Sequence, residues 1–583
     1  MKKKVISIIT GLMMVATMSL GLTSCGQADD SADSVIYSNF YTEEGGSDGV
    51  EAVAVKDGVI TFAGSKEDAE AFIGDSTETV DYSDAYALPG LIDGHCHTYV
   101  AAENTISDFQ MNGAKDQNEC VQRIEKFIKE NPDKDFYIGS GWLDSMFEND
   151  MPTAELLDKI DTDKPIYLKS EDCHSCWTNT AMMKLCEITK DTPDPAGGVV
   201  EHYANGEPAG CFRDTAMDLL IKPHVPTYTV DQYKDILDKQ MNKYIAMGYT
   251  AYNDVLIDVT SADTIVEAYH QLDQEGKLKA YVTCTYVVNN DENAEENVKH
   301  IKELADSTKG EHFDLNGVKF FMDGITESCT SYLEKPYKND KENYGVDRWA
   351  GEEGTQRLYD AATLCNDLGL IAHFHAIGDA GVKKGLDAAE YVKAHTENPD
   401  IRNAMTHIEL MDVSDIPRFK ELDMIASCDF GWCYTDCGAM YDDPNYENIE
   451  FKNLGEDRVF TEEMRYKSIL DTGAKVAFAT DFPATPNVDP FFCMEIGNTR
   501  TYDSVKGSEC IPEEALSVPE ELKAMTETTA YQLYRENDFG AIKEGMKANF
   551  VIVDQDVTTV KPAKISDTKV METFIDGVSA YAK

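Results

Sequence analysis

Between residues 88 and about 500, short apolar runs alternate with longer stretches in which apolar positions recur at helical spacing. Short apolar runs bounded by turn residues are typical of strands that are buried on both faces of a parallel sheet. Eight such runs, each followed by a helical stretch, predict an α/β protein with a (β/α)8 TIM-like barrel. The predicted strands are Leu88–His97, Gly248–Asp254, Lys279–Thr285, Val318–Asp323, Leu370–Ala376, Met405–Leu410, Met424–Phe430 and Lys475–Asp481.

The two ends of the chain show a different pattern, in which apolar and polar residues alternate and glycine-containing turns intervene. Val59–Phe62 near the N-terminus and Ala548–Asp554 near the C-terminus have this form. Alternating runs of this length predict half-buried strands. We therefore expect residues 35–88 and 540–583 to build one small β-sandwich domain together.

The remaining residues are assigned to the barrel and its additions. The barrel is expected to take residues 89–500. The stretch of about 99–231 is too long for an ordinary connection between a strand and a helix, so it predicts an inserted subdomain over the active-site face. Residues 501–539 are expected to form a helical segment that closes the barrel.

Residues 1–24 have the pattern of a targeting segment and not of a folded element. Lysines at positions 2–4 precede an uncharged, mostly apolar run, and the tetrapeptide Leu-Thr-Ser-Cys that ends at Cys25 resembles a bacterial lipobox. Residues 1–24 are therefore expected to be a lipoprotein signal peptide, Cys25 the lipidation site and residues 25–34 a linker. An uncleaved transmembrane anchor is the alternative. Both predict an extracytoplasmic protein that is anchored to the cell membrane.

Charge and cysteine content narrow the choice of partners. The chain has 52 basic and 106 acidic residues and a formal net charge of -54. Such a chain repels phosphate backbones, which argues against nucleic acid as a partner. The expected substrate is a small molecule. Contact with the membrane is expected only through the lipid anchor. The cysteines lack the spacing of a disulfide or zinc scaffold, so Cys173 and Cys176 are interpreted as packing residues, and their redox state stays open.

Candidate metal ligands lie at the ends of the predicted strands, where a barrel carries its chemistry. His95 and His97 are two residues apart at the end of the first strand, so both imidazoles point to the same side. Alone, such a pair could equally be two surface histidines. The ends of later strands add four candidates, namely Lys319, His375, His407 and Asp481. This constellation favours a metal site over chance placement.

Several motifs occur in a fixed order along the chain. They are Leu-Pro-Gly-Leu-Ile-Asp-Gly-His-Cys-His ending at His97, His-Ala-Ile-Gly-Asp from His375, Thr-His-Ile-Glu-Leu around His407, Thr-Asp-Phe-Pro around Asp481, and the segments Asp172–Asn179 and Gly540–Phe550. The set resembles the amidohydrolase superfamily, and within it the metal-dependent hydrolases of amidohydrolase family 3 that include N-substituted formamide deformylase. Cys173 stands where glycine is usual in that group.

The resemblance implies a divalent metal cofactor. Zn²⁺ is the favoured metal because it prefers imidazole and carboxylate ligands. His95, His97 and Asp481 would hold one ion, and His375 and His407 would hold a second one. Whether one or two ions bind is left open.

Lys319 needs a separate explanation, because an ammonium group cannot ligate a cation. In members of the superfamily a lysine on the fourth strand is carboxylated and bridges two metals, so the resemblance implies a carboxylated Lys319. Only a neutral amine reacts with carbon dioxide, and burial lowers the pKa of lysine. An ion pair with Asp323, two residues further on, is the alternative.

The expected reaction is hydrolysis of a non-peptide carbon–nitrogen bond, as in an amide or an N-substituted formamide. A metal-activated hydroxide would attack the carbonyl carbon. Asp481 would also be catalytic, taking a proton from the nucleophile and passing it to the leaving nitrogen. An extracytoplasmic ligand-binding lipoprotein, and a same-fold metal enzyme with esterase or lyase activity, are the alternatives.

Residues of the insertion motif are candidates for substrate contacts. We expect His174, Trp177 and Asn179 to serve this role. His373 shares a strand face with His375 and is interpreted as packing or as an outer partner of the metal site. The identity of the substrate and the oligomeric state are left open, with a dimer as one option.

Overall fold

The computed structural model describes residues 31–42, 46–105, 109–148, 151–160, 163–195, 197–441, 446–485 and 487–583. The predicted signal peptide and lipidation site Cys25 lie outside these residues, as does the first part of the predicted linker. In the described ranges, none of the helices combines the length and apolarity that crossing a membrane requires.

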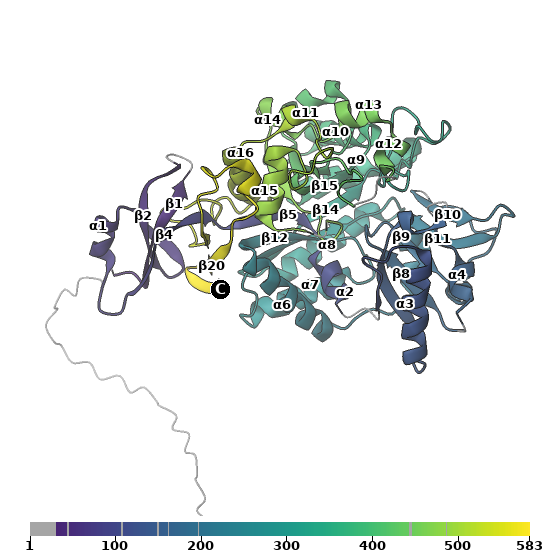
Figure 1. The fold of residues 1–583 in the computed structure, drawn as a ribbon, viewed down its shortest axis with the longest axis horizontal. Coiled ribbons are helices and arrows are strands. Elements are labelled where there is room, and N and C mark those ends of the chain that lie inside the picture. Colours follow the sequence, from purple (N-terminus) through teal and green to yellow (C-terminus); the bar gives the residue numbers. More distant parts are fainter. Residues whose placement is uncertain are drawn as a thin grey trace, which may run out of the picture.

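A sheet of eight parallel strands forms the centre of the molecule, in the spatial order β5, β12, β13, β14, β15, β16, β17 and β18 (Figure 1). The backbone N–H of Asp481 donates to the carbonyl of His95 at 2.9 Å and so links the last strand to the first. This arrangement confirms the predicted barrel. The strands are β5 (Leu91–Cys96), β12 (Tyr249–Leu256), β13 (Tyr281–Val287), β14 (Phe313–Phe321), β15 (Ile371–Ala376), β16 (Ala404–His407), β17 (Ile425–Asp429) and β18 (Val476–Ala479).

Each predicted strand overlaps an observed strand, with boundaries that differ by a few residues, and two of these differences have a clear structural reason. β14 begins at Phe313, ahead of the predicted Val318, because Phe313 and Leu315 are buried and continue the alternation. β16 ends at His407 and not at Leu410, since His407 and Ile408 have φ angles of 71° and 55° that turn the chain out of the strand. The second difference places His407 at the rim of the barrel.

Helices follow most strands and cover the outside of the barrel (Figure 1). The helix α6 begins at a capping box in which Thr229 and Gln232 bond each other's backbone N–H groups. Its buried residues recur every three or four positions, which gives it an apolar face towards the barrel. The helices are α2 (Thr98–Asn104), α6 (Val230–Ala246), α7 (Ala262–Gln274), α8 (Ala294–Thr308), α9 (Gly351–Asp367), α10 (Asp379–His395), α11 (Ile416–Glu421), α14 (Tyr466–Asp471) and α15 (Pro490–Thr499).

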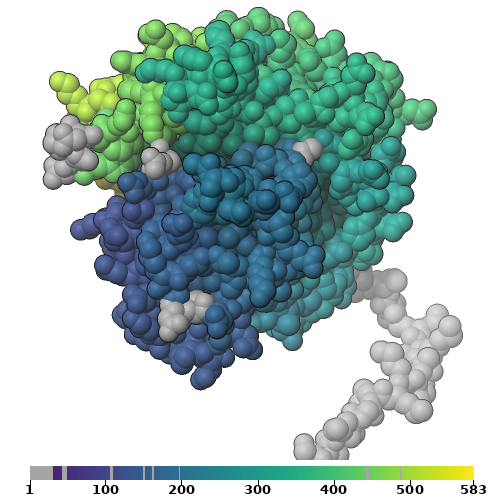
Figure 2. Space-filling view, turned by 90° about the vertical axis from the view of Figure 1, so that its right-hand side faces the viewer, coloured from purple at the N-terminus to yellow at the C-terminus, as the bar shows by residue number. Residues whose placement is uncertain are grey.

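A six-stranded sheet lies between α2 and α6 in the sequence, in the order β10, β11, β9, β8, β7 and β6. It packs along one side of the barrel, on the side away from the small N-terminal sheet (Figures 1 and 2). Its elements are β6 (Phe109–Gln110), α3 (Gln117–Glu130), β7 (Tyr137–Trp142), α4 (Ala154–Asp158), β8 (Ile166–Ser170), β9 (Ser175–Thr178), α5 (Thr180–Leu185), β10 (Gly198–His202) and β11 (Pro208–Asp214). We call this unit the insertion.

The two ends of the chain meet in a seven-stranded sheet, in the order β21, β20, β19, β4, β1, β2 and β3. The rings of Phe40 and Phe574 pack on Phe550 from both ends of the chain, with centroid distances of 5.5 and 4.8 Å. A single continuous sheet takes the place of the two separate sheets of a sandwich. Its elements are β1 (Ser34–Thr42), β2 (Gly46–Lys56), β3 (Val59–Gly64), α1 (Lys66–Ala69), β4 (Glu78–Pro89), β19 (Phe550–Val553), β20 (Val570–Ile575) and β21 (Val578–Ala582).

The segment after the barrel contains two short helices, α16 (Val518–Lys523) and α17 (Thr529–Gln532), and α17 supports the strands that carry the first and last candidate ligands. Gln532 Nε2 donates to the carbonyl of Gly94 at 3.1 Å, and Thr529 Oγ1 accepts the N–H of Phe478 at 3.1 Å. A Cβ atom at Gly94 would lie 2.8 Å from the carbonyl oxygen of Phe478, so only glycine fits here. The segment thereby fixes β5 against β18.

The described cysteines are all free thiols. Cys173 and Cys176 are buried in two different hydrophobic clusters. Their interpretation as packing residues is confirmed.

Candidate metal centre

Three of the predicted ligands meet where β5 and β18 end. His95 Nε2 lies 3.3 Å and His97 Nε2 lies 3.2 Å from Oδ1 of Asp481. All three side chains are buried, and one ligand atom from each lies within 4.8 Å of the other two. Two imidazoles and a carboxylate around a common centre are a ligand set for a divalent transition metal.

The backbone fixes the position of this set. His95 is near the end of β5, and His97 is the N-cap residue of α2. The hydrogen bond from the Asp481 N–H to the His95 carbonyl holds the carboxylate beside the histidines. Asp481 has a φ of 53°, a left-handed conformation that costs a residue with a Cβ about 1–3 kcal/mol and that persists mostly at functional sites.

His375 and His407 lie next to the first three ligands. His375 is near the end of β15, and His407 is the last residue of β16. Their ring centroids are 4.7 Å apart, and the centroids of His407 and His95 are 5.2 Å apart. These four imidazoles and Asp481 therefore belong to one continuous buried cluster.

Carbonyl groups fix which ring nitrogen of two histidines can ligate a metal. His97 Nδ1 lies 2.6 Å from the carbonyl oxygen of Val255, and His375 Nε2 lies 3.1 Å from that of Gly324. Because a carbonyl only accepts, these nitrogens carry hydrogen, and the other nitrogen of each ring keeps its lone pair. Nδ1 of His375 is buried without a hydrogen-bond partner. Outer partners of this kind are typical of histidines that ligate metals.

Asp429 and Trp432 orient His407, and sequence reasoning missed both. Asp429 Oδ2 lies 2.9 Å from His407 Nδ1, and the Trp432 ring stacks on the imidazole with a centroid distance of 5.3 Å. Asp429 is the last residue of β17. The rule that strand ends carry the chemistry could therefore have found it, whereas nothing in the sequence indicates the position of Trp432.

His373 and Asp93 support the site from inside the barrel. His373 Nε2 lies 2.7 Å from His95 Nδ1, and the two rings stack. This contact agrees with the interpretation of His373 as packing or an outer partner. Asp93 accepts hydrogen bonds from the hydroxyl of Thr480 at 2.5 Å and from the N–H of His95 at 3.2 Å. It ties the two strands together and was not recognised from the sequence.

The environment keeps the imidazoles in the form that ligates metals. Burial lowers the pKa of His95, His97 and His375 below the ordinary value. The charge of Lys319 adds to this effect at His95 and His375. At neutral pH these rings are therefore neutral, as metal binding requires.

Lys319 lies within the same cluster. Its Nζ is 3.0 Å from Nε2 of His95 and 4.7 Å from the ring centroid of Phe321. Burial lowers the pKa of Lys319 to about 7, against the opposing charges of Asp481 and Asp429. A large fraction of its amine is thus neutral at neutral pH.

Asp323 is not the partner of Lys319. Its carboxylate accepts backbone N–H groups from Ile377 at 3.0 Å, Gly378 at 2.8 Å and Tyr332 at 2.9 Å. No ion pair joins it to Lys319 in the described part of the chain. The ion pair considered from the sequence is therefore wrong, because Asp323 instead fixes the loop after β15.

His174 reaches the cluster from the insertion. Its ring centroid is 5.4 Å from that of His375, and its Nδ1 lies 2.7 Å from Oδ1 of Asp214. Burial opposes protonation of this ring, but the hydrogen bond and charge of Asp214 raise its pKa above the ordinary value. The contact with Asp214 therefore favours the protonated form of this imidazole, which stands beside the candidate ligands.

Trp177 and Asn179 are part of the frame of the insertion. Trp177 is fully buried in its core, and its Nε1 donates to the carbonyl of Thr153 at 2.8 Å. Asn179 caps α5, and its side chain also bonds the backbone of Ile166 and Lys164. Both residues are buried and their polar atoms are bonded within the insertion, so they support its structure. A contact of these two residues with substrate stays a prediction.

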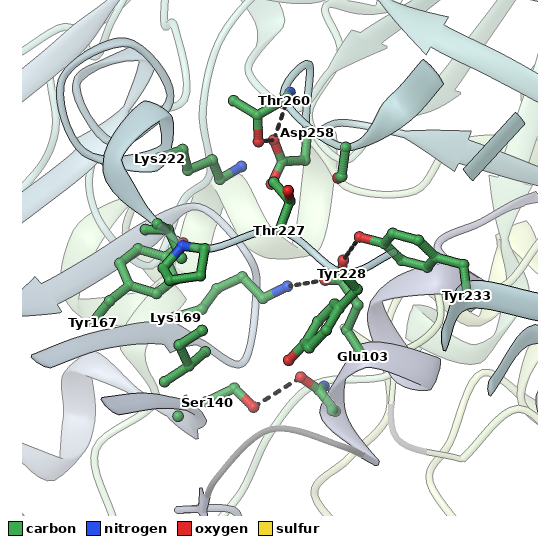
Figure 3. Close-up of a pocket in the computed structure, with 16 residues that line it drawn as sticks. Glu103, Ser140, Tyr167, Lys169, Lys222, Thr227, Tyr228, Tyr233, Asp258 and Thr260 are labelled. Atoms are coloured by element: carbon green, nitrogen blue, oxygen red, sulfur yellow. Dashed lines mark hydrogen bonds and ion pairs between the residues drawn. The ribbon is translucent and has the colours of Figure 1, made fainter. Parts of the chain in front are cut away.

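A narrow pocket opens between the barrel and the insertion. Lys169 on β8 points towards Glu103 on α2, with 3.7 Å between Nζ and Oε2, and the hydroxyl of Tyr233 donates to Oε1 of the same glutamate at 2.6 Å (Figure 3). None of the predicted metal ligands lines it. It adjoins the helix that His97 caps and is not itself the metal centre.

Comparison with known proteins agrees with the site. The sequence profile of the amidohydrolase family matches residues 78–581. A putative amidohydrolase of Bacillus subtilis, YtcJ, is 28% identical over 556 residues, which cover 93% of this chain and 97% of that protein. N-substituted formamide deformylase of Arthrobacter pascens is 26% identical over 94% of this chain and 98% of that enzyme.

A solved structure shares the fold. The uncharacterised metal-dependent hydrolase of Pyrococcus horikoshii superimposes with a TM-score of 0.69 at 21% identity, covering 91% of this chain and 99% of that one. The family match spans most of the sequence. The chain belongs to the amidohydrolase family and is a metal-dependent hydrolase that acts on carbon–nitrogen bonds.

Proposed function

We propose that this amidohydrolase hydrolyses the carbon–nitrogen bond of a small amide or an N-substituted formamide with the help of one or two zinc ions. The observation that carries the proposal is the buried set of His95, His97 and Asp481 at the ends of the first and last barrel strands. The likeness to the N-substituted formamide deformylase of Arthrobacter pascens supports this substrate class.

The residues present fit a metal. Oδ1 of Asp481 and Nδ1 of His375 are buried and have no hydrogen-bond partner, a condition that a metal ion would relieve. His95, His97 and Asp481 would hold one ion, and His375 with His407 would hold a second one. Imidazole and carboxylate together favour zinc over magnesium or calcium. When bound, zinc supplies Lewis acidity, which lowers the pKa of water and polarises a carbonyl.

Lys319 is proposed to become a ligand after carboxylation. Its neutral amine can attack carbon dioxide, forming an N–C bond and releasing one proton, to give a carbamate, which adds the two oxygens that a free lysine lacks. The position of Lys319 on β14, with its Nζ 3.0 Å from Nε2 of His95, supports a role for this group among the other ligands. The buried surroundings that lower the pKa of Lys319 also favour the reaction at neutral pH.

Side chains of the protein would carry out the proton transfers. Asp481 is ionised, because the nearby histidines hold its pKa well below the ordinary value despite its burial. It can accept the proton of the attacking water and deliver it to the leaving nitrogen. His174, whose contact with Asp214 favours its protonated form, could bind the substrate's carbonyl or leaving group. Water is added across the bond, which yields an amine and a carboxylic acid.

The test is amine release by purified, zinc-loaded protein from a panel of N-formyl and N-acyl amines, measured beside esters with the same acyl groups. We expect at least one member of the panel to release amine. Turnover of the esters with no amine released from any amide would overturn the assignment and favour the esterase alternative.

The proposal that the protein is membrane-anchored rests on the sequence before residue 26. Cys25 is expected to carry lipid, because it ends a lipobox-like tetrapeptide after a basic and apolar segment. Cells given a clickable fatty acid should label the natural protein and not the Cys25→Ser variant. Equal labelling of the two would show that Cys25 is not the lipidation site.

A further inference from the structure

The carboxylates of three glutamates outside the metal centre lie close together, in the part of the chain that follows β16. Glu409 follows β16, Glu450 lies on α12 (Ile449–Asn453), and Glu463 follows α13 (Glu456–Glu462). One carboxylate oxygen from each lies within 4.8 Å of the other two. The N–H of Met464 donates to the carbonyl of Glu409 at 2.8 Å and fixes two of these segments together.

Glu463 is a buried member of this cluster whose carboxylate is not compensated by any polar partner that the structure describes. Its side chain points into the cluster, only 1% of the residue is exposed, and neither carboxylate oxygen has a hydrogen-bond partner. An ionised carboxylate buried without partners is strongly destabilising. A cation bound between the three side chains would offset this unfavourable free energy.

Among the described residues, no side chain supplies that positive charge. Thr326 donates to Oε1 of Glu409 at 2.8 Å, and this is a neutral hydrogen bond. The nearby Arg500 is engaged with Cys510, whose carbonyl accepts its Nε at 2.8 Å. In the described part of the chain none of the three glutamates forms an ion pair. Burial and the neighbouring acids accordingly raise the pKa of Glu463 well above the ordinary value.

We propose that Glu409, Glu450 and Glu463 bind a calcium ion that is separate from the catalytic metal. Carboxylate oxygens without imidazole or thiolate are the ligands of hard cations. Ca²⁺ holds oxygens at about 2.3–2.6 Å, so two of its ligands are at most roughly 4.6–5.2 Å apart. The three carboxylate oxygens, which all lie within 4.8 Å of one another, satisfy this limit. Mg²⁺ keeps several waters, which a site this buried does not favour. Glu450 is only partly buried and gives the ion a path from the surface.

The experiment is equilibrium dialysis of the zinc-loaded protein against radioactive Ca²⁺, with zinc kept in the buffer. The natural chain is expected to bind one Ca²⁺ per molecule. Glu463→Gln should bind it at least about tenfold more weakly, because a charged ligand is replaced by a neutral one. Glu456→Gln is the matched control, since it removes an exposed acid from the neighbouring helix and should bind like the natural chain. No Ca²⁺ binding by the natural chain, or equal binding by Glu463→Gln, would overturn the proposal.

Thermal unfolding separates the loss of a ligand from a folding defect. Without Ca²⁺, Glu463→Gln should unfold at a temperature no lower than the natural chain, because it replaces a buried carboxyl group that has no hydrogen-bond partner with an amide of the same size. Ca²⁺ should raise the Tm of the natural chain and of Glu456→Gln, and it should leave Glu463→Gln unchanged. Glu450→Gln, at the surface side of the cluster, should lose the Ca²⁺-dependent shift as well. An equal shift in all four proteins would contradict a site at these residues.

Discussion

Asp481→Asn is expected to retain at least one divalent metal per chain while its kcat falls at least about a hundredfold. The variant keeps the size of the side chain and one oxygen that can ligate. It loses the ability to accept a proton at neutral pH, and the loss of a general base typically costs about 10² to 10⁴ in rate. His95 and His97 still converge on the same point, with His375 and His407 beside them.

The measurement combines elemental analysis with the rate of amine release at saturating substrate. Asp471→Asn is the matched control, because this aspartate lies on α14 with a side chain that is 64% exposed, and it should behave like the natural enzyme. An Asp481→Asn enzyme with bound metal and near-normal turnover would limit Asp481 to a role as a ligand. A variant without metal would leave the two roles inseparable and contradict the expected retention.

Lys319→Ala is expected to lose metal and at least about a hundredfold in activity. If the carboxylated lysine supplies a bridging group, its removal takes away a ligand and leaves a cavity at the centre of the barrel. The natural side chain is 1% exposed. Short carboxylic acids such as acetate fit such a cavity and carry the missing carboxylate, so they should restore part of the activity when metal is supplied.

The control for this prediction is Lys129→Ala, which truncates an exposed lysine on α3 and should change neither metal content nor rate. Full metal occupancy in Lys319→Ala would mean that no ligand was removed. In that case the 3.0 Å contact between Lys319 and His95 would be an ordinary hydrogen bond within the barrel.

The barrel and the positions of its candidate ligands could be predicted because both depend on short-range patterns. Parallel strands buried on both faces give apolar runs, and the ends of these runs in a barrel meet on one face. His95, His97 and Asp481 were predicted in this way from segments nearly 400 residues apart, and the structure brings them together. The chain leaves β16 at His407, where φ is positive. No local sequence pattern predicts this turn, so the predicted strand continued too far.

Contacts between loops and strands far apart in sequence could not be predicted. The strand-end rule points to Asp429 as a site residue, but its hydrogen bond with His407 depends on the relative depth of β16 and β17 in the barrel, which an apolar run does not encode. Trp177 and Asn179 were assigned to the substrate by resemblance, but the packing of the insertion core decides where they lie. The proximity of Glu409 and Glu463 depends likewise on the conformation of the loops, which no local sequence pattern predicts.

The most direct test of the central claim, a catalytic metal held by the histidine and aspartate cluster, is a zinc titration of metal-free protein followed by amine release. The substrate is the best amide or formamide of the panel. Activity should be absent without metal, rise in proportion to added zinc and reach a plateau at one or two equivalents per chain. The His97→Ala variant should need more zinc to reach this plateau or should fail to reach it. Full amine release by the metal-free protein would contradict the account.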